Sequence, residues 1–236
     1  GRGGNLRLGF STGSGMKWLH DARNVEARYR GGFMVYEIRD PFLDKGALVV
    51  SAVSPKQGEG LILKVESTPE SPAVELHVAF GGITGERGRR DGDIGCEPLP
   101  VRDFFRFKPG YCKGNQIAMD GNRFMVRADH GGIAGLLPPD SRIVNANADH
   151  WDDIAKLDSA VPAQAGPAIV HAKFPLRSGA AAYLGLQHFP VKLLGKKSAE
   201  ELLAVHRDAA LQDMAGQAEN WTQAELPARF EREKKS

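Results

Sequence analysis

The sequence has few cysteines and no long apolar run. Its two thiols, Cys96 and Cys112, are too few for a disulfide scaffold or a four-cysteine zinc site. Their spacing leaves open either one bridge or two buried free thiols. A helix that crosses a membrane needs about eighteen or more consecutive apolar residues, and the sequence contains no such run. We therefore expect no membrane span.

Neither sign of charge dominates the chain. Lys and Arg total 31, Asp and Glu total 29, and the two kinds are interspersed. A nucleic-acid-binding domain would instead show a basic stripe or patch. The densest basic segment, residues 87–90, has no neighbouring aromatic residue on which a base could stack. The sequence therefore predicts no nucleic-acid partner.

Short apolar runs with period-two alternation occupy the middle of the chain. In residues 74–80, Glu75 and His77 alternate with apolar neighbours, which predicts a strand with one buried face. A hairpin is predicted around Asp120-Gly121-Asn122, because glycine readily takes the positive φ of a tight turn. Gly81-Gly82 and Gly131-Gly132 are interpreted as further turns. Other strands are predicted at residues 33–39, 47–53, 61–66, 168–174 and 181–188.

These short strands follow one another without a long amphipathic helix between them, which argues against a parallel α/β sheet. We predict an all-β fold, an antiparallel β-sandwich over residues 1–195. After Gly195 the pattern becomes helical, and residues 196–236 are predicted to form a helical linker. Leu202, Val205 and Phe230 belong to its apolar side, which we expect to be exposed and to need a partner domain.

Both helices of this linker have recognisable start signals. Ser198 and Glu201 stand three residues apart, as in a capping box, where each side chain satisfies a free N–H group of the first turn. Thr222 and Glu225 repeat the spacing, while Pro227 suits a first helical position. We therefore predict one helix from Ser198 onward and a second that begins near Pro227.

Two polar loops are candidate binding sites. In residues 87–95, glycines would let the backbone approach a ligand, and Arg89, Arg90 and Asp93 could bind it. Asp91 and Asp93 offer hard oxygens of the kind calcium takes, but the further acids of a calcium loop are absent. A plain Asp-Gly turn is the more economical interpretation. We predict no cofactor, and calcium is the one ion that this loop would suit.

The second loop contains Tyr111, Lys113 and Asn115. Tyr111 could stack on a sugar ring while Lys113 and Asn115 bind its hydroxyl groups. A loop that simply leads into a strand is the more economical interpretation.

The segment from Asp149 to Asp153 combines three carboxylates, an imidazole and an indole. Its ligand types are mixed and it lacks a second His at helical spacing, so we favour Asp149 or Asp152 as a helix N-cap with Trp151 docked on the core. The sequence also lacks a Gly-x-Ser-x-Gly elbow and a phosphate loop. The catalytic residues are left unassigned.

A series of segments then indicates a family. The segments are residues 3–10, 27–30, 59–66, 79–82, 92–95 and 111–115. Their order resembles the N-terminal region of a family of large bacterial proteins from polysaccharide-degrading species. The resemblance runs from Gly3 to about Arg232, and residues 226–230 look like the start of a link to a further domain.

The resemblance implies a β-sandwich of the supersandwich type, joined by a helical linker to an (α/α)6 toroid similar to those of glycoside hydrolases. It implies that the opening strands and the toroid lie outside this chain, and that a catalytic acid would lie in the toroid. A periplasmic or secreted bacterial location is implied as well. The expected partners are a carbohydrate and the C-terminal (α/α)6 domain of the same polypeptide.

Three functions are compatible with these observations. The first is an accessory sandwich domain that shapes a carbohydrate cleft with its loops and is not an active enzyme alone. The second is a free-standing carbohydrate-binding module, for which three Trp and four Tyr are a thin supply of stacking platforms. The third is a non-catalytic structural or assembly protein. The resemblance favours the first.

Overall fold

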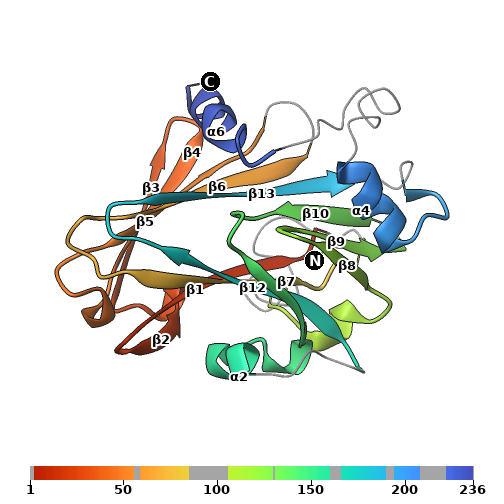
Figure 1. Ribbon diagram of the computed structural model, residues 1–236, viewed down its shortest axis with the longest axis horizontal. Helices are drawn as coiled ribbons and strands as arrows, with labels where there is room; N and C mark the ends of the chain where they lie inside the picture. Colours follow the sequence, from red (N-terminus) through yellow and green to blue (C-terminus); the bar gives the residue numbers. More distant parts are fainter. Residues whose placement is uncertain are drawn as a thin grey trace, which may run out of the picture.

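The computed structural model describes residues 3–55, 59–84, 106–129, 131–159, 166–189, 194–207 and 222–235. The described chain is an all-β sandwich of two antiparallel sheets, as the alternating pattern predicts (Figure 1). Short helices lie on the outer faces of both sheets. None of the described helices is long and apolar enough to cross a membrane.

The smaller sheet has five strands in the order β11-β12-β7-β1-β2. Every neighbouring pair in it is antiparallel. Its strands are β1 (Asn5–Thr12), β2 (Gly15–Trp18), β7 (Val74–Gly81), β11 (Arg142–Asn147) and β12 (Ala168–Leu176).

The larger sheet has eight strands in the order β3-β4-β5-β6-β13-β10-β9-β8, again antiparallel throughout. Its strands are β3 (Asn24–Arg30), β4 (Phe33–Arg39), β5 (Leu48–Val53), β6 (Gly60–Ser67), β8 (Gln116–Asp120), β9 (Arg123–Ala128), β10 (Gly131–Leu136) and β13 (Ala181–Phe189). The helical elements are η1 (Leu19–Asp21), η2 (Pro41–Leu43), η3 (Pro109–Cys112), η4 (Ala148–His150), α2 (Ile154–Ser159), α4 (Ala199–Arg207) and α6 (Leu226–Lys234).

The main core lies between the sheets. Alternate residues of each strand point inward, so Leu76 and Val78 of β7 meet Phe10 of β1 and Phe124 of β9 in one buried cluster. Each of these side chains is at most 2% exposed. The six strands predicted from the sequence are all present, and the predicted hairpin is confirmed with Gly121 at φ 56°.

The predicted turn at Gly131-Gly132 is wrong. Both residues belong to β10, which pairs with β9 on one side and β13 on the other. Glycine is needed in this strand because neighbouring side chains fill the space above it. A Cβ at Gly135 would lie 2.1 Å from the ring of Phe124, and one at Gly132 would lie 3.1 Å from Leu194.

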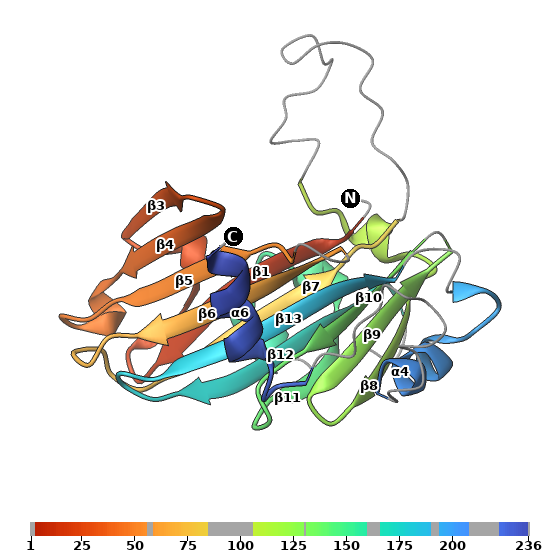
Figure 2. The ribbon, with the colours of Figure 1, turned by 90° about the horizontal axis from the view of Figure 1, so that it is seen from above.

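The C-terminal helices pack on the outer face of the eight-stranded sheet (Figure 2). Leu202 of α4 and Phe230 of α6 are 0% and 1% exposed. Our expectation that the apolar side of this segment is exposed and needs a partner domain is therefore wrong for these two residues, and Val205 is itself partly buried. The same sequence pattern that signals a buried helix face is satisfied here by the chain's own sheet.

The two helix starts follow the predicted capping. Glu201 N donates to Ser198 Oγ at 3.3 Å, and Ser198 N donates to a Glu201 carboxylate oxygen at 2.6 Å. Thr222 N donates to a Glu225 carboxylate oxygen at 3.1 Å, and Pro227 stands in the first turn of α6. Both sequence signals for the start of the second helix are thus used together.

Candidate functional site

In the part of the chain that the structure describes, one end of the sandwich is open between the sheets. A cavity of about 350 Å³ lies where β1 begins and where β7 and β13 end. Leu6, Phe80 and Ile133 form part of its apolar wall, and they come from both sheets. Gly4, at φ 83°, keeps the first turn of the chain close to this wall, because a Cβ there would lie 2.9 Å from the Phe80 ring. The cavity is therefore an extension of the core that reaches the surface.

A polar pair lies at the edge of this cavity. His188 Nδ1 is 2.5 Å from a carboxylate oxygen of Glu59, and His188 N donates to Glu59 O at 2.8 Å. The Glu59 side chain is 78% exposed, whereas the His188 side chain is 16% exposed. The pair combines an accessible carboxylate with an oriented imidazole beside an apolar surface. Such an edge can accept and donate hydrogen bonds to a ligand that carries hydroxyl groups.

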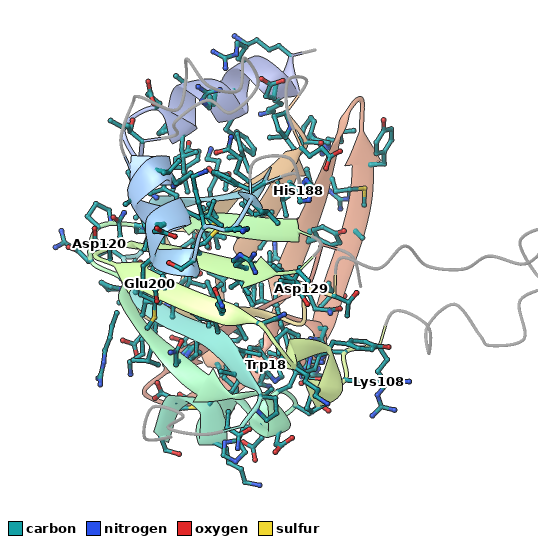
Figure 3. The ribbon with its side chains drawn as sticks, turned by 90° about the vertical axis from the view of Figure 1, so that its right-hand side faces the viewer. Trp18, Lys108, Asp120, Asp129, His188 and Glu200 are labelled. Atoms are coloured by element: carbon teal, nitrogen blue, oxygen red, sulfur yellow. The ribbon has the colours of Figure 1, made fainter. Side chains whose placement is uncertain are left out.

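The η3 loop is fastened beside the same end. Ile83 N donates to Asn115 Oδ1 at 3.2 Å, and Asn115 Nδ2 donates to Ile83 O at 2.7 Å. Ile83 in turn approaches Gly4, which lines the cavity. Figure 3 looks toward this end of the sandwich and shows His188 near the middle of the view and Lys108, just before η3, at the lower right. The loop and the cavity are thus held at the same end of the sandwich.

The predicted site residues of this loop have different environments. Lys113 is exposed, Tyr111 is half-buried, and the amide of Asn115 is engaged with the backbone of Ile83. Cys112 between them is a buried free thiol, and burial raises its pKa to about 11. Carbohydrate binding by Tyr111, Lys113 and Asn115 stays a prediction.

The other predicted loop falls outside the described residues. Arg89, Arg90 and Asp93 belong to residues 85–105, as does Cys96. The described residues on either side of that segment meet, because Phe107 packs against Gly82, where a Cβ would lie 2.9 Å from the Phe107 ring. The described residues that flank the segment are therefore close together, just beyond the end of β7.

The indole of the Asp149–Asp153 segment is docked on the protein, as predicted. Trp151 is 4% exposed and stacks on Phe107 with ring centroids 4.0 Å apart. The guanidinium of Arg7 lies 4.9 Å from the Trp151 ring centroid and 2.9 Å from an Asp152 carboxylate oxygen. These contacts give the segment a structural role at the edge of the five-stranded sheet.

The predicted capping residues of this segment are wrong by one or two positions. Asn147 caps η4 by accepting from Asp149 N at 2.9 Å, and Asp153 caps α2 by accepting from Lys156 N at 3.0 Å. Asp152 instead pairs with Arg7. Sequence propensity identifies a group of capping residues, but the helix boundary decides which of them is used.

The Glu59–His188 pair was not found from the sequence. Glu59 precedes β6 and His188 ends β13, and only the pairing of these two strands brings them together. No local spacing reports such a contact.

A family described as Domain of unknown function (DUF4450) matches residues 1–173. No curated protein matches the chain. Among solved structures, a bacterial glucoamylase complexed with acarbose matches at a TM-score of 0.54 and 11% identity, over 97% of this chain and 31% of that chain. A putative kojibiose phosphorylase from human microbiome matches at 0.43 and 10% identity, over 98% of this chain and 27% of that chain. The chain thus spans less than a third of the length of either structure.

Proposed function

The chain belongs to the DUF4450 family, and we propose that its sandwich is an accessory domain of a glycoside-hydrolase-like protein, in which it shapes one wall of a carbohydrate cleft. On this proposal catalysis lies mainly in an (α/α)6 domain of the same polypeptide, and the sandwich alone is not active. The observation that supports it is the coverage of the glucoamylase match, 97% of this chain against 31% of that one. A protein with such a role would be periplasmic or secreted.

The open end is the part of the sandwich suited to this role. The exposed carboxylate of Glu59 and the ammonium of Lys113 can bind hydroxyl groups of a glycan that lies across the end. Arg89, Arg90, Asp93, Tyr111 and Asn115, the residues predicted from the sequence, would extend this contact. The mechanism is positional: the loops hold the glycan in register for chemistry performed elsewhere.

A free-standing carbohydrate-binding module has less support. Such a module uses a platform of exposed aromatic rings, and the one large aromatic residue exposed in the described part of the chain is Tyr29, at 72%. It lies on the edge strand β3, away from the cavity-lining residues. One isolated ring does not make a platform.

Two measurements test the proposal. An intact mass far above 25.6 kDa for the protein from its native host would support it, and a mass near 25.6 kDa would overturn it. In the native-length protein, Glu59→Gln and Lys113→Ala are expected to weaken glycan binding and turnover several-fold. Lys45→Ala, at an exposed position beyond η2, is the matched control and should change neither. Unchanged binding in both site variants would remove the open end from the glycan cleft.

A further inference from the structure

We propose that His77, His171 and Asp158 form a binding site for a divalent transition metal, with zinc as the best fit, on the outer face of the five-stranded sheet. This site is separate from the open end, and the inference does not depend on the proposed carbohydrate function.

The strand register places the two imidazoles together. β7 and β12 are antiparallel neighbours, with His77 opposite Lys173 and His171 opposite Ala79. Side chains of His77 and His171 therefore point to the same outer face, as diagonal neighbours. Their atoms approach closely: His77 Nδ1 lies 3.3 Å from His171 Nε2.

Helix α2 brings the carboxylate to this face. It crosses the sheet above Gly9, the residue opposite His77 on β1. A Cβ at Gly9 would lie 2.4 Å from Ile154 Cδ1, so glycine is what allows the helix to sit this close. Asp158, near the end of α2, then joins the pair, and one ligand atom from each of the three residues lies within 4.8 Å of the others.

The spacing fits a tetrahedral ion. Two nitrogens bound to zinc at about 2.0–2.1 Å with tetrahedral angles are roughly 3.3 Å apart. The separation of His77 Nδ1 and His171 Nε2 is 3.3 Å, so the imidazoles already stand at ligand spacing. A carboxylate oxygen of Asp158, within 4.8 Å of a ligand nitrogen of each imidazole, would be the third ligand. Three protein ligands leave a fourth position for water or a substrate atom.

The surroundings support ligand function. Ser11 Oγ lies 2.9 Å from His77 Nε2, the nitrogen that would not face the metal, and such a partner fixes the ring and its tautomer. Both imidazoles are buried, at 0% and 3% exposure, and burial lowers the pKa of each to about 4. They are therefore neutral at pH 7, which is the form that coordinates metals.

The ammonium of Lys173 would compete with a metal ion for the carboxylate of Asp158. This ammonium lies 2.9 Å from the Asp158 carboxylate and 3.3 Å from that of Glu75. In the absence of an ion this contact neutralises Asp158, whereas a bound ion would have to displace it. The Lys173 and Asp158 side chains are 23% and 21% exposed, so this side of the site is in contact with solvent.

The same atoms could instead form a purely structural hydrogen-bonded pair, in which one imidazole N–H donates to the other ring. The two interpretations differ in their response to metal. We would strip the intact chain with EDTA and titrate it with Zn²⁺ and Co²⁺, following heat, thermal unfolding and the visible spectrum of the Co²⁺ form. A site predicts one equivalent of ion, a raised melting temperature and a tetrahedral Co²⁺ spectrum.

Variants assign the ligands. His171→Asn should abolish the Zn²⁺-dependent rise in melting temperature, and Asp158→Asn should weaken binding roughly tenfold or more. Lys173→Gln should tighten binding several-fold, because it removes the cation that competes for Asp158. His206→Gln is the matched control, since His206 is equally buried but lies on α4 over the other sheet.

Absence of stoichiometric binding would overturn the site, as would equal loss of binding in His206→Gln. Should His171→Asn fail to fold, the opposite effects expected of Asp158→Asn and Lys173→Gln decide the question, because both residues are partly exposed. Unchanged affinity in both of these variants would also overturn it.

Discussion

Phe230→Ala tests how the C-terminal helix is held. Phe230 is 1% exposed and packs with Leu226 against Val53, Ile62 and Leu136 of the eight-stranded sheet. Its ring also meets Tyr183 edge-on, with centroids 5.9 Å apart. Nine residues form α6, and helices this short are marginal in water without such packing.

The free-energy cost of removing the Phe230 ring decides whether only α6 detaches or the whole domain unfolds. Truncating a buried Phe to Ala costs about 3–5 kcal/mol. Leu226 stays buried in the same cluster, whereas two polar contacts of this segment are small: Gln223 Nε2 donates to Tyr183 O at 3.2 Å, and Lys234 Nζ lies 5.3 Å from the Phe33 ring centroid. Each of these two polar contacts is worth about 1 kcal/mol. We therefore expect α6 to leave the sheet while the sandwich stays folded, because the sheet core does not depend on Phe230.

Hydrogen exchange followed by mass spectrometry measures this directly. In Phe230→Ala, amides of α6 should exchange at least a hundredfold faster, while those of β13 and β6 should be unchanged. Glu231→Ala is the matched control, since Glu231 is partly exposed and its pair with Lys234 at 3.9 Å is weak. Unchanged protection of α6 would refute the burial argument. Equal loss of protection in β13 would show that helix and sandwich unfold as one unit.

Two further predictions concern the sandwich itself. Gly135→Ala should destabilise the fold by about 1–3 kcal/mol, seen as a lower melting temperature, because the new Cβ would lie 2.1 Å from the buried Phe124 ring. Gly110→Ala is its control, since a Cβ at Gly110 would have nothing within 4 Å. Equal losses of stability in both variants would contradict the steric reason. His206→Gln should make the loss of stability with acid shallower. Burial lowers the pKa of His206 to about 4 from 6.5, so the unfolded state binds the extra proton first, and stability falls as pH drops from 6.5 towards 4 and then levels off. The loss of unfolding free energy that His206 causes between these pH values is about 3 kcal/mol. Urea melts measure it, and identical pH dependence of stability in wild type and variant would contradict this role of His206.

Alternation predicted the strands whose two faces differ. The strand predicted at residues 33–39 has the observed bounds of β4, although most of its side chains are half-buried rather than fully buried. β10 has no such contrast: glycines fill it where Phe124 and Leu194 take the space, and all six of its residues are buried. β3 was not predicted, for the opposite reason: every residue from Asn24 to Arg30 is exposed, so neither face of the strand is buried.

The candidate sites could not be predicted from the sequence, because they depend on which element packs on the outer face of a sheet. Alternation correctly put His77 on the face away from the main core, but the residue is 0% exposed since α2 lies over it. Its partner His171 comes from a strand far along the chain, and Asp158 from a helix of six residues. A periodic pattern reports which side of an element is apolar, and it carries no information on the element that packs there.

The covering of the outer faces also restricts where a partner domain can bind. Helices α4 and α6 bury Leu202 and Phe230 on the chain's own larger sheet, and α2 with Trp151 covers part of the smaller one. The large hydrophobic residues left exposed in the described part are Val25, Tyr29 and Met119, two of them on the edge strand β3. Charged residues such as Glu26 and Arg28 alternate along that edge, which discourages strand addition. On the proposed function, we expect the partner domain to contact the open end of the sandwich rather than these helices. A charge-reversing Lys113→Glu substitution should then weaken its docking more than a surface substitution on α4, as binding of the separately produced domains would measure.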